Sequence, residues 1–307
     1  MSEKHPLVSI GLPVYNGENF IEQAIDSILA QTFKDFELII SDNASNDKTE
    51  AICRKYVTKD KRIRYYRNSQ NLGAAPNFNR VYELSTGTYF KWLAHDDLCE
   101  PEFIERCVHL FEKDDSIVLC NSRVKIIDAC GQTMDKTDDL YGYVSSLTAN
   151  LNLFSSTPHV RFRDIIRPHA CFPVFGLIRS SSLKNTSLLG SYAGADRILL
   201  AQLALQGRFY EFPEQFLYQR RHLHQSIQGL KSHSSAHRYT YWFDTATKGK
   251  LIFPRWQLFW NLITSVLQAP LTWQEQIKCY LAMKGWLKRY GLGMIEDLTI
   301  ALQGKRV

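Results

Sequence analysis

Two adjacent carboxylates and a histidine directly follow an apolar run in the segment Tyr89 to Asp97, YFKWLAHDD. The apolar residues predict a strand, and a strand that ends at His95, Asp96 and Asp97 places oxygen ligands at its carboxyl end, where open α/β sheets bind ligands. Adjacent acids repel each other unless a positive charge lies beside them, and a divalent cation with a diphosphate is a common reason for such a pair. A helix cap or a solvated turn is the alternative interpretation.

Polar residues also follow three other apolar runs. They are Pro13, Tyr15 and Asn16 after 8–12, Asp42 and Asn43 after 36–40, and Asn71 and Gly73 after 63–66. Because parallel strands present their carboxyl ends at one edge of a sheet, we expect these loops to converge with the Asp96 loop on one crevice. A nucleotide needs such features: a slot for the base, an acid for a base N–H, small residues near the ribose and a metal for the diphosphate.

The elements that must hold these loops alternate between strand and helix patterns. Apolar residues recur at helical spacing from Asn19 to Thr32, and Lys48 to Val57 is entered through polar residues that favour helix caps. Further helices are expected over 77–85 and from Pro101, and a strand over 117–127. This alternation predicts an α/β fold with a mostly parallel, right-handed central sheet flanked by helices.

Composition and cysteine usage bound the class of protein. The 307 residues are 45% hydrophobic and 22% charged, which suits a globular domain of about 230 residues with an appendage. The seven cysteines are scattered and form no CxxC pair, so they indicate reduced thiols in a cytoplasmic compartment rather than a disulfide framework or a zinc site. The N-terminus has no long apolar segment, so we expect no signal peptide.

Two common nucleotide-binding signatures are missing from the sequence. No GxGxxG follows the first predicted strand, and GxxxxGK[ST] does not occur. Dinucleotide-dependent oxidoreductases and P-loop NTPases are therefore disfavoured.

Four segments carry a resemblance to a known family. In chain order they are PVYNG at 13–17, SDNASNDKT at 41–49, NLGAAPNFN at 71–79 and WLAHDD at 92–97. In this order and spacing they resemble the nucleotide-sugar-binding half of the family 2 inverting glycosyltransferases, which have a GT-A fold. The resemblance covers about the first 130 residues, and four ordered motifs are far more specific than any one of them.

The resemblance implies roles for particular residues. Tyr15 and Asp42, with Pro13 and Asn16 beside them, would hold the nucleobase, and Asn71, Gly73 and Asn79 would shape the pocket for the ribose and the diphosphate. Asp96 and Asp97 would form the DxD-type metal motif, with Asp97 as the direct ligand of Mg²⁺ or Mn²⁺. The chain departs from the family pattern at His95, which replaces the first carboxylate, and at Phe78, which replaces an arginine often found before the equivalent of Asn79.

Two later segments would complete the site. Family members place an acidic general base at the start of a helix, and GADRILLAQLALQGR at 194–208 matches that pattern with Asp196. A carboxylate near a helix N-terminus stays ionised and can accept the proton of an acceptor hydroxyl, although Asp196 as a simple helix cap is the alternative. YQRRHLHQS at 218–226 resembles the segment that in many relatives brings a histidine and basic residues over the diphosphate. The resemblance implies that His222 or His224 would contact the metal there. We prefer His222, and a lone surface histidine is the alternative.

The C-terminal part is basic and rich in tryptophan. Residues 231–307 contain 11 Lys and Arg against 4 Asp and Glu, and five of the six tryptophans. An apolar stripe is expected there at Trp256, Phe259, Trp260, Ile263, Val266 and Leu267. The stripe is too short and too polar around its girth to span a bilayer. It favours a helix lying in the membrane interface, where lipid-linked acceptors are found, and packing on the body or on another subunit is the alternative.

The sequence thus predicts a GT-A catalytic domain over 1–230 and a basic, aromatic, helical appendage over 231–307. The expected activity is metal-dependent, inverting transfer of a sugar from a nucleoside diphosphate sugar, by resemblance a UDP-sugar, to a hydroxyl of a glycan or lipid-linked oligosaccharide in cell-surface polysaccharide biosynthesis. We expect a cytoplasmic protein at the membrane face, with no nucleic acid partner, and a homo-oligomer is left open. A catalytically silent nucleotide-sugar-binding scaffold subunit is the alternative. A sugar-nucleotide pyrophosphorylase is disfavoured because its glycine- and lysine-rich N-terminal phosphate loop is missing.

Overall fold

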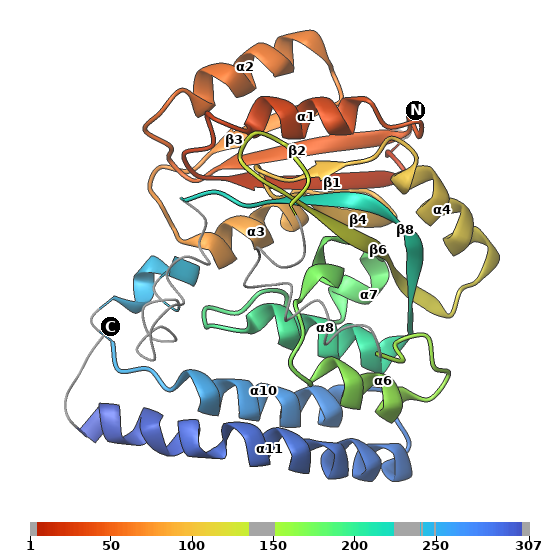
Figure 1. The fold of residues 1–307 in the computed structure, drawn as a ribbon, viewed down its shortest axis with the longest axis vertical. Helices are drawn as coiled ribbons and strands as arrows, with labels where there is room; N and C mark the ends of the chain where they lie inside the picture. Colours follow the sequence, from red (N-terminus) through yellow and green to blue (C-terminus); the bar gives the residue numbers. More distant parts are fainter. Residues whose placement is uncertain (1–4, 135–150, 224–239, 241, 249, 303–307) are drawn as a thin grey trace.

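An eight-stranded sheet forms the centre of the protein (Figure 1). The computed structural model describes residues 5–134, 151–223, 240, 242–248 and 250–302. The strand order is β3-β2-β1-β4-β7-β6-β8-β5. The strands are β1 (Val8–Val14), β2 (Phe36–Asp42), β3 (Ile63–Arg67), β4 (Tyr89–Trp92), β5 (Leu98–Cys99), β6 (Ile117–Ile127), β7 (Leu177–Arg179) and β8 (Arg208–Arg220).

Helices cover both faces of this sheet (Figure 1). They are α1 (Ile21–Leu29), α2 (Thr49–Lys59), α3 (Ala74–Glu83), α4 (Phe103–Lys113), α6 (Pro158–Ile165), α7 (Ser180–Lys184), α8 (Ala195–Gln206), α10 (Pro254–Gln268) and α11 (Trp273–Leu302), with short 3₁₀ turns at η1 (Phe172–Phe175) and η3 (Thr245–Thr247). The predicted α/β fold with a mostly parallel sheet, flanking helices and a helical C-terminal region is confirmed.

The register of the first strands brings their carboxyl ends to one edge. β1 pairs in parallel with β2 and β4, and β2 pairs in parallel with β3. Val14 lies opposite Asp42, and Gly11 lies opposite Trp92. The loops after β1, β2, β3 and β4 therefore leave the sheet at the same edge, as the sequence predicts. The second half of the sheet is mixed, because β7 runs antiparallel to β4 and β6 while β6 and β8 are parallel.

Two hydrophobic clusters lie on the two faces of the sheet. Alternation along the strands separates them, since Leu38 and Ile40 of β2 belong to one cluster and Ile39 to the other. The first cluster joins the sheet to α1 and α4. The second joins it to α3, α6 and α8.

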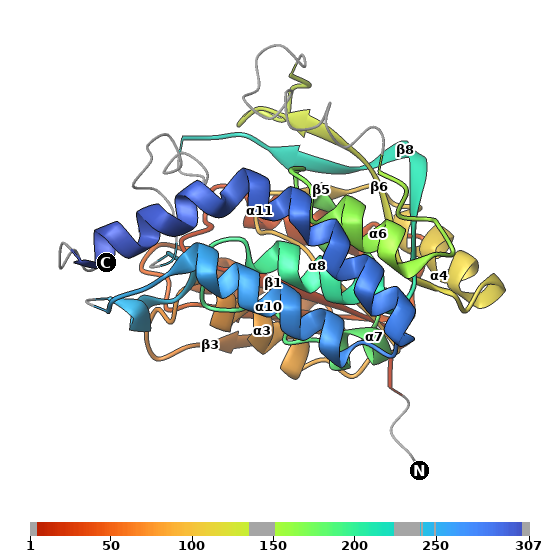
Figure 2. The same cartoon turned by 90° about the horizontal axis from the view of Figure 1, so that it is seen from below.

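The C-terminal helices α10 and α11 extend the second cluster. Figures 1 and 2 show them side by side as the layer furthest from the sheet, against α6 and α8. Their buried residues share one core with α8: Leu262, Val266, Cys279, Met283, Trp286 and Met294. The boundary at residue 230 stays a prediction, but the described part of this region packs into the body.

The expected apolar stripe of α10 is divided between two environments. Val266 is fully buried, and the indole of Trp256 donates a hydrogen bond to the Met294 carbonyl of α11 at 3.0 Å. Only Trp260 and Leu267 stay exposed, at 56% and 59%. Most of the stripe therefore packs on the protein. None of the helices that the structure describes is both long enough and apolar enough to cross a membrane.

Candidate active site

Asp42 ends β2 as a fully buried carboxylate. Its Oδ2 accepts hydrogen bonds from the Tyr65 hydroxyl at 2.7 Å and from Arg67 at 3.3 Å, and its Oδ1 accepts one from the Ser45 amide at 2.8 Å. Burial and the hydrogen bond to Asp42 raise the pKa of Tyr65. The carboxylate is thus fixed in one orientation at the edge of the sheet.

The loop after β1 is joined to the loop after β2. Asn16 has a left-handed φ of 52°, its amide donates to Ser45 Oγ at 2.9 Å, and its Oδ1 accepts from the Asn46 amide at 2.9 Å. Pro13 is buried within β1, whereas the Tyr15 ring is 44% exposed beside it. The Tyr15 side chain is therefore available to stack on a planar ligand. Pro13 is part of the buried strand next to Tyr15.

Asn43 connects the β2 loop to the loop after β3. Its Nδ2 donates to Asn71 Oδ1 and to the Gly73 carbonyl, both at 2.9 Å, while its Oδ1 accepts from the Leu72 amide at 3.0 Å. Asn68 also donates to Asn43 Oδ1 at 2.9 Å. The structure therefore brings Asp42, Asn71 and Gly73 together through Asn43. The role of Asn68 is not evident from the sequence, where it is one polar loop residue among several.

Gly73 has a backbone conformation that few other residues adopt. Its φ is +90°, and an added Cβ would lie 2.6 Å from the Phe243 carbonyl oxygen. Glycine is required here because both the dihedral angle and the close approach exclude a side chain. The segment around η3 also holds this loop, since the Thr245 hydroxyl donates to the Asn71 carbonyl at 3.1 Å.

Gly73→Ala is expected to lower the free energy of unfolding by roughly 1–3 kcal/mol, the cost of a strained backbone with a poorly accommodated side chain. Urea unfolding measures this change. The matched control is Gly285→Ala in α11, where nothing lies within 4 Å of the new Cβ. That substitution should stabilise the helix by up to about 1 kcal/mol. Equal effects of the two substitutions would contradict the role given to Gly73.

Asn79 lies apart from this network. On α3, its Nδ2 donates to the Leu189 carbonyl at 2.9 Å, and its Oδ1 accepts from the Leu189 amide at 3.0 Å. It lines an open pocket of about 570 Å³ together with residues of α3 and the 189–191 loop: Leu72, Pro76, Arg80, Glu83, Leu84, Leu189 and Ser191. Its polar atoms are thus engaged by the backbone that leads to α8. Its contact with a ribose stays a prediction.

Asp96, in the loop after β4, and His222, just after the end of β8, form a close pair. His222 Nε2 lies 2.9 Å from Asp96 Oδ2, and the ring of Phe20 lies 4.7 Å from the His222 ring. Burial raises the pKa of Asp96, but the interactions with His95 and with His222, including the hydrogen bond to His222, outweigh it and lower this pKa to about 2. Asp96 is therefore an ionised carboxylate with a histidine beside it. His224 lies outside the described residues.

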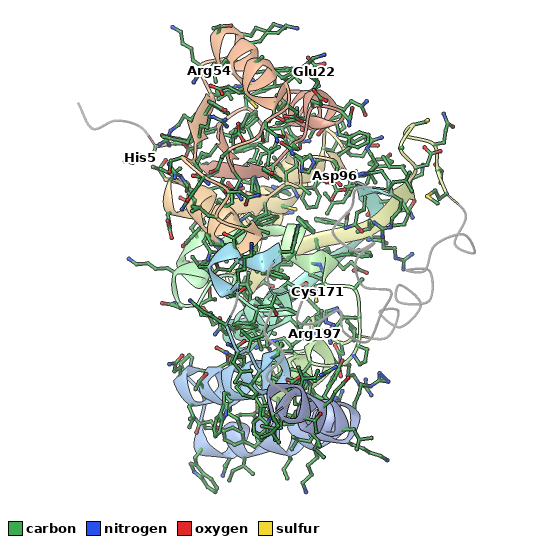
Figure 3. All side chains as sticks on the ribbon, turned by 90° about the vertical axis from the view of Figure 1, so that its left-hand side faces the viewer. His5, Glu22, Arg54, Asp96, Cys171 and Arg197 are labelled. Carbon is green, nitrogen blue, oxygen red and sulfur yellow. The ribbon has the colours of Figure 1, made fainter. Side chains whose placement is uncertain are left out.

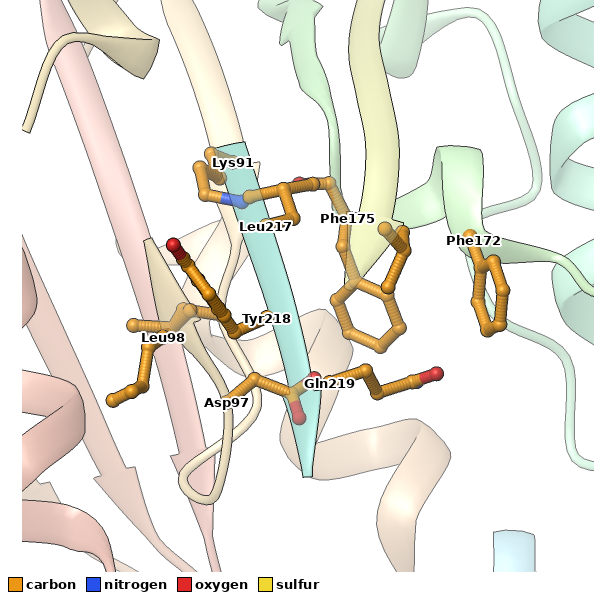
Figure 4. A pocket seen from close by; sticks show the side chains of 10 residues that line it. Lys91, Asp97, Leu98, Phe172, Phe175, Leu217, Tyr218 and Gln219 are labelled. Atoms are coloured by element: carbon orange, nitrogen blue, oxygen red, sulfur yellow. The ribbon is translucent and has the colours of Figure 1, made fainter. Parts of the chain in front are cut away.

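Asp97 faces a different environment from that of Asp96. It accepts a hydrogen bond from the Arg220 amide at 3.0 Å and lines a small cavity of about 20 Å³ with Lys91, Phe175 and Tyr218 (Figure 4). Burial, and after it the charge of Asp96, raise the pKa of Asp97 well above its usual range. The sequence favours Asp97 as the direct metal ligand, whereas the structure brings Asp96 to His222 and turns Asp97 inward.

Arg220 organises both acids, and sequence reasoning does not single it out from Arg221. It is fully buried, its Nε donates to the Asp96 carbonyl at 2.9 Å, and its Nη2 donates to Gln23 at 2.6 Å. Its guanidinium carbon lies 4.8 Å from the centre of the Phe20 ring. Arg220 thus fixes the loop that carries Asp96 against α1 and the end of β8, two residues before His222.

The geometry of the Asp96 and His222 pair is compatible with a divalent cation whose remaining ligands come from a bound substrate and water. The facing atoms of this pair share a hydrogen bond of 2.9 Å. Two ligands at adjacent corners of a Mg²⁺ octahedron are also roughly 2.9 Å apart, so a cation would take the place of the shared proton. His222 Nδ1 is buried and has no hydrogen-bond partner among the described residues. No cluster of three or more His, Cys, Asp or Glu side chains in the described part of the chain could hold a metal alone. Magnesium sites often use one or two protein ligands and complete the shell with phosphate oxygens and water.

Asp196 lies in the first turn of α8, two residues after Gly194, which has a left-handed conformation with φ +83°. Its Oδ1 accepts a hydrogen bond at 2.9 Å from the Arg197 amide, which also donates to the Gly194 carbonyl at 3.0 Å. Burial and then the charge of Asp196 raise the pKa of the Cys171 thiol to about 12. Arg197 Nη2 also lies 3.9 Å from the Cys171 sulfur, and both residues are labelled in Figure 3.

This strand order, with helices on both faces and polar loops at one edge, is that of a GT-A fold. Residues 9–185 match the family model described as Glycosyl transferase family 2. The chain belongs to this family.

Relatives are similar to part of the chain. A glycosyltransferase of Rickettsia typhi is 44% identical over 118 residues, which cover 38% of this chain and 36% of that protein. Chondroitin synthase of Escherichia coli is 32% identical over 150 residues, which cover 49% of this chain and 20% of that protein. The chain thus matches a minor part of the length of these relatives.

Solved structures with low sequence identity share the fold. S. aureus TarS 1–349 in complex with UDP-GlcNAc has a TM-score of 0.62 and 16% identity, with 92% of this chain and 72% of that chain covered. The mannosyltransferase PcManGT from Pyrobaculum calidifontis, in complex with GDP-Man and Mn²⁺, has a TM-score of 0.54 and 15% identity, with 98% of this chain and 81% of that chain covered.

Proposed function

We propose that the protein is an inverting glycosyltransferase that moves a sugar from a nucleoside diphosphate sugar to a hydroxyl of a glycan or lipid-linked oligosaccharide. Family membership supports a transferase. The single observation that carries the site is the Asp96 and His222 pair, at the same sheet edge as the Asp42 and Asn71 loops. The motifs favour a UDP-sugar as donor and cell-surface polysaccharide biosynthesis at the cytoplasmic face of the membrane as the setting.

The nucleoside would lie over the loops that Asn43 joins. The exposed Tyr15 ring offers a surface on which a base can stack. Asp42 has acceptor capacity left after its internal hydrogen bonds and would accept from a base N–H. Gly73, whose missing side chain leaves room for the Phe243 carbonyl, would hold the Asn71 loop in the conformation that shapes the ribose pocket.

Asp96 and His222 are the residues that would hold Mg²⁺ or Mn²⁺ together with the diphosphate oxygens. When bound, such a cation neutralises the charge that develops on the leaving diphosphate. Arg220 would keep Asp96 in place through its hydrogen bond to the Asp96 carbonyl. Asp97, turned toward the small cavity, would support the loop rather than bind the cation.

Asp196 would act as the general base. Its position in the first turn of α8 favours the ionised carboxylate, because the helix dipole places positive partial charge there. It would accept the proton of the acceptor hydroxyl as that oxygen bonds to the anomeric carbon and the bond from that carbon to the diphosphate breaks. Attack opposite the leaving group inverts the anomeric configuration.

The alternative is a scaffold subunit that binds nucleotide sugars without turnover. Such a protein would keep the Asp42 network and the Asp96 and His222 pair but would not need Asp196 as a base. Measuring nucleotide release and donor binding in the wild type and in an Asp196 variant separates the two functions, because only an enzyme loses turnover on substitution while donor binding is kept.

A further inference from the structure

The solvent-facing side of α11 carries a long row of apolar side chains. They recur at helical spacing and are 48% to 88% exposed: Trp273, Ile277, Leu281, Leu292, Ile295 and Leu302. The opposite side of the same helix is buried against the body through Cys279, Met283, Trp286 and Met294. The helix is therefore apolar on two sides, and the protein covers one of them.

This row is too extensive to be ordinary surface variation. Single exposed leucines need no explanation, but a row of large apolar side chains along one side of a helix, here interrupted by Lys284 and Lys288, is typical of an interaction site. At a rise of about 1.5 Å per residue, the helix extends for roughly 45 Å. The neighbouring α10 adds the exposed Trp260 and Leu267 to this layer (Figure 2). We call the exposed side of α11 the outer face.

The acidic residues of α11 have ion-pair partners, whereas several of its basic residues do not. Each of its acids pairs with a cation: Glu275 with Lys278 at 3.4 Å, Glu296 with Arg255 at 3.2 Å and Asp297 with Arg255 at 2.7 Å. The exposed cations Lys284, Lys288 and Arg289 have no carboxylate partner among the residues that the structure describes.

The unpaired lysines belong to the outer face. At 100° per residue, Lys284 and Lys288 fall within the row formed by 273, 277, 281, 292 and 295. Arg289 lies beside that row. The outer face is thus apolar and cationic, with no unpaired acid in its described part.

We propose that the outer face of α11 lies on an anionic lipid surface. Apolar side chains of an interfacial helix enter the boundary between headgroups and acyl chains, while lysines beside them pair with headgroup phosphates. A second copy of the chain fits the same face poorly. A two-fold interface would bring like-charged lysines together, and the face has no unpaired acid to receive them. The lipid contact depends on this surface alone, but its link to a lipid-linked acceptor rests on the proposed function.

The test is co-sedimentation of the full chain with vesicles of phosphatidylcholine, with or without phosphatidylglycerol. Binding should require phosphatidylglycerol and weaken at high salt, because salt screens the lysine charges. Lys284→Gln/Lys288→Gln should weaken binding by about 5-fold for each charge removed. Leu281→Gln/Ile295→Gln should weaken it by at least about 10-fold at every salt concentration. The matched control is Lys59→Gln/Lys61→Gln at the end of α2, on the far side of the molecule (Figure 1), and it should bind normally.

Two further readouts distinguish the outcomes. All four proteins should bind UDP equally, so that lost vesicle binding is not a folding defect. Wild-type protein that stays in the supernatant under every condition, while Leu281→Gln/Ile295→Gln converts a dimer to a monomer in sedimentation equilibrium, would overturn the proposal in favour of a subunit interface. Vesicle binding without transfer of any sugar would leave the lipid surface standing and reject the proposed function.

Discussion

Asp196→Asn is expected to lower the rate of sugar transfer by roughly 10²-fold or more, the scale on which a general base contributes. The amide cannot accept the proton of the acceptor hydroxyl, but it can still accept the hydrogen bond that the Arg197 amide donates to Asp196. Helix α8 and the donor site should therefore stay intact. Single-turnover transfer measures the rate, and calorimetry with the nucleotide measures donor binding.

The control for this substitution is Asp115→Asn, because the Asp115 side chain is fully exposed. It should change neither rate nor affinity. If Asp196→Asn transfers sugar as fast as the wild type, Asp196 is not the base and its role is limited to the first turn of α8. If neither protein transfers sugar although both bind the nucleotide, the scaffold function is favoured.

Asp96→Asn is expected to remove most of the metal-dependent affinity for the donor nucleotide. Loss of a residue that only orients a metal ligand typically costs about 10- to 100-fold in metal affinity, and loss of a ligand itself should cost at least as much. The comparison that decides between the two acids is Asp97→Asn. An amide there can still accept the hydrogen bond from the Arg220 amide, and it faces the small cavity rather than His222. We therefore expect a change of less than about 3-fold for Asp97→Asn.

Titration of UDP with and without Mn²⁺ measures both effects. His222→Ala should resemble Asp96→Asn, because the two side chains face each other at 2.9 Å. A large loss of metal-dependent binding for Asp97→Asn together with normal binding for Asp96→Asn would restore Asp97 as the direct ligand.

The first half of the fold follows from the sequence because its signals are local. The predicted strands over 8–12, 36–40 and 63–66 correspond to β1, β2 and β3, and the strand over 117–127 corresponds to β6. The predicted helix over 77–85 instead begins at Ala74, since Gly73 with its positive φ ends the loop immediately before it. The convergence of the loops after β1 to β4 is a consequence of parallel pairing, which periodicity predicts.

The second half depends on contacts that a single sequence does not reveal. β7 has three residues and pairs with strands on both sides, and such a short strand gives no periodic signal. Both lysine and arginine are usually solvated, so the burial of Lys91 and Arg220 is not predicted by residue type. The predicted apolar stripe correctly indicates the amphipathic helix α10. Which of its apolar residues are covered is revealed only by the packing of α10 against α8 and α11.

In the candidate site, too, some features follow from local sequence signals and others depend on tertiary contacts. Motif order locates Asp42, Asn71, Gly73 and the two adjacent acids, because each follows a strand at the same edge. Which acid meets His222 depends on Arg220, which binds the Asp96 carbonyl through its side chain and the Asp97 carboxylate through its backbone. Which acid lies next to His222 is therefore decided by tertiary contacts, because 126 positions separate Asp96 from His222 in the sequence.

Product analysis with a panel of sugar nucleotides tests the central claim most directly. The chain should be incubated with Mn²⁺, each UDP- and GDP-sugar in turn, and a set of glycan and lipid-linked acceptors, with Asp96→Asn as the inactive control. The anomeric configuration of any product is then determined by NMR. We predict that at least one donor yields a glycoside of inverted configuration and that the control yields little or none. A product of retained configuration, or equal product from Asp96→Asn, would contradict this account.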